Sequence, residues 1–188
     1  MILELPEVSK HVWISGFKLR LSNVDQVLGE LGKRFPEVCM QLVDLNQVAG
    51  SRYLLLAALN AIKSFQSKHP IAKTLSMEIL LYTAASRQIS EAINRVGVSS
   101  KTNQVGALAV GASQEEVRSA GEFLSQLLKQ PSDDQLVDQW TQARVEAVRS
   151  AFEIGEKEVK AIIRKDEKTE TAIERLAIER SAMLTIKK

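Results

Sequence analysis

The uncharged segment Val105–Gly111, with the sequence VGALAVG, is the feature that most restricts the fold. A strand without any charged side chain is typical of a central strand that is covered on both faces. The chain therefore needs a sheet with other elements packed on each side of it. Its 188 residues are enough for one such domain with a substantial core. We expect a single domain over residues 1–188.

Three further segments are candidates for strands. Residues 11–19 (HVWISGFKL) are rich in β-branched and aromatic side chains. Residues 38–45 have a similar composition, but Gln41 and Asp44 predict partial exposure. Residues 183–186 (MLTI) are predicted to close the sheet as a terminal strand. Together these segments indicate a small, mostly antiparallel sheet of about four strands.

The remaining segments predict helices. Residues 50–65 form a helical pattern that is apolar almost all round, which is typical of a helix buried on several sides. Within it we assign residues 54–59 to the core. Further helices are expected to begin at or near Ser22, Pro70, Ser86, Ser113, Pro131 and Ala172. The whole is an α+β (mixed α/β) fold, in which the sheet packs against six to eight helices.

The charge of the chain is nearly balanced but unevenly distributed. The 25 Lys and Arg residues and 23 Asp and Glu residues give a net charge of +2, which argues against a general, charge-driven nucleic-acid binder. Residues 1–111, however, carry +4, and residues 112–188 carry −2. No acidic residue lies between Asp44 and Glu78. This interval is either a solvated helix face or a modest basic surface for a polyanion.

The sequence contains no recognisable catalytic or metal-binding motif. The two histidines, His11 and His69, lie in different segments without a cysteine or carboxylate at ligand spacing. The glycines at 97, 106 and 111 match neither of the common phosphate-binding loops. Cys39 lies inside a predicted strand and is interpreted as a small buried hydrophobe. We therefore expect a protein that is not an enzyme and that uses no metal or cofactor.

Targeting signals are also missing from the sequence. No apolar stretch approaches the roughly 20 residues that a membrane span requires. The first residues, MILELPE, lack a basic region followed by an apolar block, so secretion is not expected. A single cysteine cannot form an intramolecular disulfide, which suits a reducing compartment. These features predict a cytoplasmic protein without a membrane partner.

Two segments together resemble one known family. The first is residues 70–93, PIAKTLSMEILLYTAASRQISEAI, which follow GSRYL at 50–54 and precede Gly97 and the uncharged strand. The second is IERSAML at 178–184. Both resemble the PRPK-binding proteins, the small regulatory subunit of the KEOPS (EKC) complex of archaea and eukaryotes. The resemblance covers most of the chain, and the EILLY…RQIxEAI string is its most specific part.

The resemblance implies a non-catalytic role in modifying tRNA. KEOPS transfers a threonylcarbamoyl group to the adenosine beside the anticodon, and another subunit performs this chemistry. The family is known to bind and stimulate the atypical kinase/ATPase subunit, and in archaea to hold the single-stranded 3′ CCA end of tRNA. The implied partners are the kinase, tRNA and, indirectly, other KEOPS subunits. An archaeal cytoplasm is favoured, or the nucleus and cytoplasm of a eukaryote.

Two other functions stay open beside this one. The first is a kinase-regulating interaction protein without RNA contact, which would use the same apolar helix face. The second is a small-molecule enzyme. This alternative is weaker, because no catalytic motif supports it.

Kinase binding is assigned to the predicted helix 86–96. Its apolar residues share one face, and that face cannot serve fully as both core and interface. We assign Ile89 to the core and expect Val96 to protrude, with Ile93 and Arg95 beside it, as an apolar patch ringed by charge.

RNA binding is assigned to the basic residues of the first part of the chain. Arg87 and Gln88 are expected near RNA, although the same two residues also fit a solvated first helical turn with Arg87 paired to Glu91. Tyr53 replaces a histidine that the family often has and can stack on a base. Ala84-Ala85 replaces a Ser-Gly pair and is expected to stiffen the turn before Ser86. The predicted phosphate contacts are Arg52, Lys63, Lys68 and Lys73.

Overall fold

The uncharged strand lies inside a four-stranded antiparallel sheet. The computed structural model describes residues 1–185. The strand order is β1-β2-β4-β3, so that β4 pairs with β2 on one side and β3 on the other. The strands are β1 (Ile2–Leu5), β2 (Lys10–Phe17), β3 (Cys39–Asp44) and β4 (Val105–Gly111). The predicted sheet is confirmed, although its fourth strand is β1, which the sequence did not indicate.

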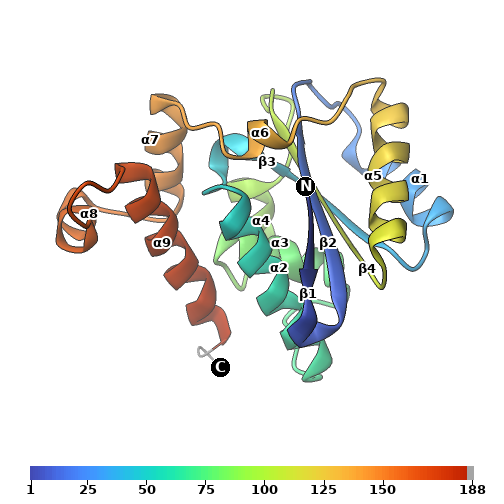
Figure 1. The fold of residues 1–188 in the computed structure, drawn as a ribbon, viewed down its shortest axis with the longest axis horizontal. Coiled ribbons are helices and arrows are strands. Elements are labelled where there is room, and N and C mark those ends of the chain that lie inside the picture. The colour runs from blue at the N-terminus through green and yellow to red at the C-terminus, as the bar shows by residue number, and fades with distance from the viewer. Residues whose placement is uncertain (186–188) are drawn as a thin grey trace.

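Both faces of β4 are buried, as its sequence requires. Leu108 and Val110 belong to one apolar cluster, whereas Val105, Ala107 and Ala109 belong to another. Successive side chains of the strand thus enter two different cores. The helices α1 (Val24–Arg34) and α5 (Gln114–Leu128) cover one face, and α2 (Ser51–Gln66), α3 (Leu75–Ala84) and α4 (Ile89–Val96) cover the other (Figure 1).

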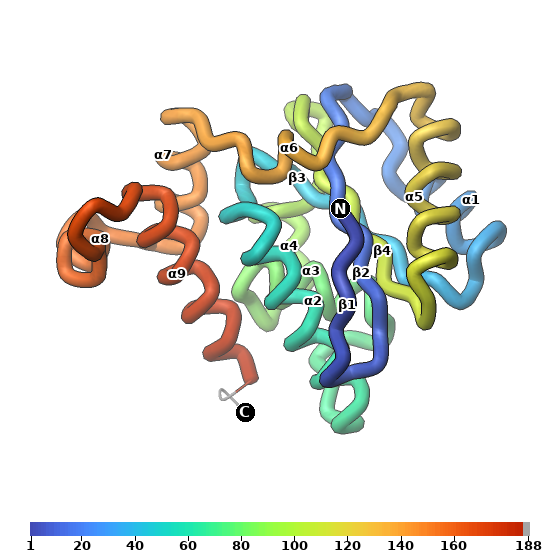
Figure 2. Tube along the Cα trace, viewed as in Figure 1, coloured from blue at the N-terminus to red at the C-terminus, as the bar shows by residue number. Residues whose placement is uncertain are grey.

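A further helical layer lies beyond α2. Figure 2 shows the chain leaving α5, crossing one end of the sheet and descending on the far side of α2. Helix α9 packs against α2, α7 and α8. The elements of this crossing and layer are α6 (Asp134–Val137), α7 (Gln142–Ala151), α8 (Glu156–Ile162) and α9 (Thr169–Ala182). The short 3₁₀ helices are η1 (Pro6–Val8), η2 (Leu45–Gln47) and η3 (Met183–Thr185).

The mixed α and β class is confirmed, with nine α-helices in residues 1–185. The number exceeds the expected six to eight because one predicted helix is divided into α6 and α7, and because α8 was not predicted. The residues Met183–Thr185 form a 3₁₀ helix, so the predicted closing strand is wrong over them. Ile186 lies outside the described residues.

The buried side chain of Arg144 binds the backbone at the break between α6 and α7. Arg144 is 1% exposed, and its guanidinium donates to the carbonyl oxygens of Val48 (2.8 Å) and Val137 (2.7 Å), among others. These bonds satisfy carbonyl groups at the end of α6 and beside η2, which would otherwise be buried without donors. Burial lowers the pKa of Arg144 to about 10, so the side chain remains charged at neutral pH.

Only some of the helices begin at the residues that the N-cap and proline patterns predict. The predicted capping box of α5 is present, because the Ser113 hydroxyl accepts from the Glu116 amide at 3.2 Å and the Glu116 carboxylate accepts from the Ser113 amide at 3.1 Å. Asn23, not Ser22, caps α1. Helix α3 begins at Leu75 with Thr74 as its N-cap, and Pro70 is not in its first turn as predicted, because residues 70–73 form a loop.

Cys39 lies in β3, so its predicted place in a strand is confirmed, but it is half-buried and not the buried hydrophobe that was expected. Burial raises the pKa of its thiol to about 12, so little reactive thiolate is present at neutral pH. Within residues 1–185, no helix combines the length and apolar character needed to cross a membrane.

Candidate functional site

Helix α4 exposes an apolar pair. Ile89 and Ile93 lie one turn apart and are each 47% exposed, whereas Ala92 and Val96 on the inner side are fully buried. The predicted protrusion of Val96 is therefore wrong, and so is the assignment of Ile89 to the core. The reason is that α4 packs on α3 through Ala92 and Val96, where the small Ala92 permits close approach. Ile93 is exposed as expected.

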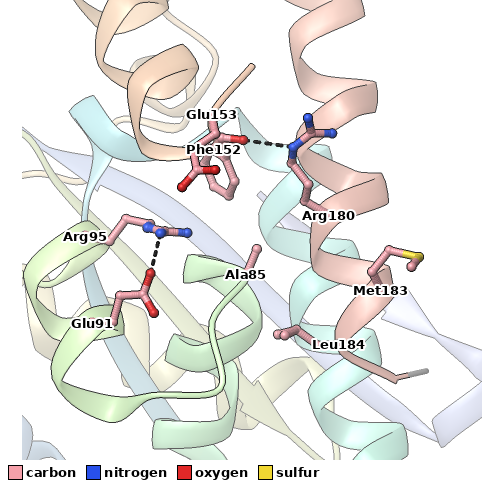
Figure 3. Close-up of a pocket in the computed structure, with 8 residues that line it drawn as sticks. All are labelled: Ala85, Glu91, Arg95, Phe152, Glu153, Arg180, Met183 and Leu184. Atoms are coloured by element: carbon pink, nitrogen blue, oxygen red, sulfur yellow. Dashed lines mark hydrogen bonds and ion pairs between the residues drawn. The ribbon is translucent and has the colours of Figure 1, made fainter. Parts of the chain in front are cut away.

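Arg95 lies on the other flank of α4. Its guanidinium donates to the Ala84 carbonyl at 2.8 Å and pairs with Glu91 at 2.5 Å. The pairing predicted between Arg87 and Glu91 is thus replaced by one between Arg95 and Glu91. Arg95 and Glu91 line a hollow of about 360 Å³ between α4 and the end of α9, where Leu184 lies opposite them (Figure 3).

Ser86 belongs to the turn before α4. The prediction that it caps the helix is wrong. Its hydroxyl accepts from the Gln88 amide at 3.1 Å and donates to the Glu91 carboxylate at 2.6 Å. Gln88, which is exposed, occupies the N-cap position instead. The side chain of Glu91 therefore joins the turn to the first turn of the helix.

Tyr53 is a core residue and cannot stack on a base. Its side chain is fully buried, and its hydroxyl donates to the Thr83 carbonyl at 2.6 Å, with the Tyr82 carbonyl 3.2 Å away. The predicted stacking is therefore wrong. The last carbonyl groups of a helix have no partner within it, and those of α3 face the core, where Tyr53 supplies a donor. Burial strongly raises the pKa of the Tyr53 hydroxyl.

A cleft of about 310 Å³ lies at the C-terminal end of α2 and brings two predicted RNA contacts together. Lys63 approaches from α2, and Arg87 approaches from the turn before α4. The Arg87 guanidinium also donates to the Leu184 carbonyl at 3.3 Å, which connects this turn to the end of the chain. The remaining lining residues are Asn60, Ser64, Ser67, His69, Ile71, Tyr82, Leu184 and Thr185.

The other predicted RNA contacts do not line this cleft. Lys68 and Lys73 are exposed and lie in the segment that joins α2 to α3. Lys68 is next to the cleft residue His69, and Lys73 is two positions after the cleft residue Ile71. Arg52 is exposed at the opposite end of α2, about 16 Å from Lys63 along the helix axis.

Sequence reasoning missed the polar part of the cleft. In the sequence His69 has no partner at metal-ligand spacing, and Ser64 and Ser67 belong to no motif, so that none of the three is predicted as a site residue. The signal that could have found them is a group of polar residues near the end of an apolar helix, next to Lys63 and Lys68. The described residues contain no group of three or more side chains that could hold a metal ion.

The amino-acid sequence matches a known family. A family model described as kinase binding protein CGI-121 matches residues 20–185. The chain belongs to this family. The predicted membership is thereby confirmed, and the match includes the α3–α4 segment that carries the exposed isoleucines. It also includes the cleft at the end of α2.

A curated relative is found in Yarrowia lipolytica (strain CLIB 122 / E 150), where it is named EKC/KEOPS complex subunit CGI121. The two sequences are 21% identical over 112 residues, which is 60% of this chain. The matched part spans 66% of the relative, just under two thirds of its length.

Proposed function

We propose that this chain is a non-catalytic subunit of a cytoplasmic KEOPS complex, which binds and stimulates the atypical kinase/ATPase subunit during threonylcarbamoyladenosine modification of tRNA. Membership of the kinase binding family and the name of the yeast relative support this role. The observation that carries it is the pair Ile89 and Ile93, each 47% exposed on one short helix.

The exposed pair has the properties of a small protein-binding centre. Complete burial of an isoleucine contributes about 1.5–3 kcal/mol, so covering the exposed half of each side chain contributes about 1 kcal/mol. Ser90, Asn94 and Glu91 are exposed on the same helix and can form a polar rim. A rigid helix with two adjacent apolar anchors loses little conformational entropy when a partner covers it.

The substitution Ile93→Glu tests this surface. It should abolish co-purification with the kinase subunit, because it places an unpaired charge at the centre of a dry contact. The melting temperature should stay within a few degrees, since the position is half-exposed. Asn94→Glu adds the same charge on the next exposed residue and should weaken binding less. Kinase binding that survives Ile93→Glu would contradict the proposed surface.

We further propose that the cleft at the end of α2 holds the single-stranded 3′ CCA end of tRNA. Lys63 and Arg87 can contact phosphate, and the serine hydroxyls and His69 can form hydrogen bonds. Ile71 and Leu184 offer apolar surface to a base. Lys68, Lys73 and Gln88 lie next to the cleft and can contact adjacent nucleotides, whereas Arg52 would be reached only by a strand that extends along α2.

The alternative is a kinase regulator that makes no RNA contact. The burial of Tyr53 favours it, because the aromatic side chain predicted to stack on a base is fully enclosed in the core. The small net charge of +2 also favours it. A gel shift with purified tRNA at two salt concentrations distinguishes the two functions.

The substitution Lys63→Glu tests the cleft. It should weaken tRNA binding and reduce the salt dependence by about 0.7 in the slope of log K against log salt, the value for one phosphate contact on a single strand. Lys33→Glu makes the same charge change at an exposed position of α1, on the other face of the sheet, and is the matched control. Equal effects of the two substitutions, or equal binding of tRNA with and without its CCA end, would contradict the assignment.

A further inference from the structure

We infer that Glu78 is a positioning residue for the cleft, because it fixes the loop that forms one of the cleft walls. This inference rests on the proposed RNA-binding function of that cleft. Glu78 lies in the first turn of α3 and does not line the cleft itself. It acts through residues 70–73, the loop that precedes α3.

The Glu78 carboxylate is fully buried and is bound by backbone amides. Oε1 and Oε2 lie 3.1 and 3.0 Å from the Ile71 amide nitrogen, and Oε2 also accepts from the Ala72 amide at 2.7 Å. Among the ion pairs of the described residues, none involves Glu78. The amides and the first turn of α3 therefore supply the compensation that a buried charge needs.

A second clamp holds the other end of the same loop. The Ser64 hydroxyl donates to the His69 carbonyl, and the His69 amide donates to the Ser64 carbonyl, both at 3.3 Å. The two clamps thus hold His69 and Ile71, which line the cleft and are separated only by Pro70, and Lys73 follows the clamped Ala72. The backbone of this wall is thus fixed to α2 at one end and to α3 at the other.

By its charge alone, a carboxylate at this position would weaken RNA binding. A negative charge behind a binding site for a polyanion repels phosphate, most strongly where little water screens it. The Glu78 charge helps RNA binding only if the binding free energy gained by fixing the loop exceeds the binding free energy lost to this repulsion. Removal of the charge therefore has opposite expected effects under the two interpretations. Tighter RNA binding indicates simple repulsion, and weaker binding indicates positioning.

The substitution Glu78→Gln separates these effects. Glutamine retains the shape but replaces one acceptor oxygen by an NH₂ group. If its remaining oxygen takes the place of Oε2, which binds both amides, the NH₂ group stands where Oε1 accepts from the Ile71 amide, so that an acceptor is replaced by a donor. The probes are full tRNA and a single-stranded oligonucleotide that ends in CCA. We expect binding of both to weaken about tenfold, the equivalent of one lost hydrogen bond. Co-purification with the kinase should be unchanged, because the exposed face of α4 is not altered.

Two further measurements exclude a general loss of stability. Val117→Ala removes buried side-chain volume on the opposite face of the sheet and should lower the melting temperature without changing RNA affinity. Hydrogen exchange of the Ile71 and Ala72 amides should become at least tenfold faster in Glu78→Gln and stay unchanged in Val117→Ala. The exchange measurement reports on the loop without any RNA.

The outcomes also separate this inference from the function on which it rests. If Glu78→Gln leaves RNA binding unchanged or tightens it, the positioning role is overturned while the cleft stands. Unchanged exchange of the two amides overturns the role as well. If the wild-type chain binds neither probe, the RNA-binding function fails, and the inference fails with it.

Discussion

At the scale of single residues, several positions are decided by hydrogen bonds that form only in three dimensions. Tyr53 illustrates this, because its partner carbonyls at Thr83 and Tyr82 belong to another helix. Ser181 from α9 also donates to the Tyr82 carbonyl, at 2.8 Å. The sequence shows an aromatic residue beside Arg52, but it cannot show that the end of α3 needs donors there. Prediction of an exposed aromatic residue failed for this reason.

Ala85 has a strained backbone conformation. It follows α3 with φ of 50°, a left-handed conformation that costs a non-glycine residue roughly 1–2 kcal/mol. Ala85→Gly should therefore raise the free energy of unfolding by about 1 kcal/mol in chemical denaturation. The same change at the neighbouring Ala84, which is helical and buried, should lower it by about 1 kcal/mol. Equal signs for the two variants would show that the turn is not strained.

At the scale of elements, local rules predicted most helices and strands, and tertiary packing decided which faces are exposed. The capping box of α5 and the buried β4 follow from short stretches of sequence alone. Helix α4 shows the limit, because its apolar residues at positions 89, 92, 93 and 96 were correctly grouped on one face. Only the packing of α3 against Ala92 and Val96 leaves Ile89 and Ile93 outside. The sequence therefore predicts an exposed apolar patch on α4, but it places Val96 in that patch and Ile89 in the core, which is the reverse of what the structure has.

The loop at 70–73 shows the same limit for the cleft that we propose binds RNA. Proline at position 70 is compatible with a first helical turn, and that was the prediction. In the structure the fully buried Glu78 carboxylate binds the Ile71 and Ala72 amides, and α3 begins only at Leu75. A side chain reaching back six or seven residues is not part of any short capping pattern. The wall of the cleft could therefore not be derived from sequence periodicity.

At the scale of the whole molecule, the layers meet where α2 begins. Asp138, which follows α6, accepts from the Ser51 amide at 2.8 Å and from the Ser51 hydroxyl at 2.7 Å. Glu174 of α9 is half-buried beside the same helix end. Burial raises the pKa of Glu174, the nearby Asp138 charge raises it further, and Arg52 partly offsets both. We therefore expect the packing of α9 on α2 to depend on pH.

Glu174 should destabilise the folded protein at neutral pH. Because its pKa is raised above the ordinary value of 4.5, Glu174 binds its proton more tightly in the folded state than in the unfolded state. Its contribution to the free energy of unfolding is therefore fully present below about pH 4.5 and decreases as the pH rises through the folded pKa. Glu174→Gln should raise the melting temperature at pH 7 and make little difference at pH 4. Glu170→Gln, at the start of the same helix, is the matched control, and calorimetry at both pH values measures the difference. A lower melting temperature for Glu174→Gln at pH 7 would show that attraction to Arg52 outweighs the cost of burying the charge.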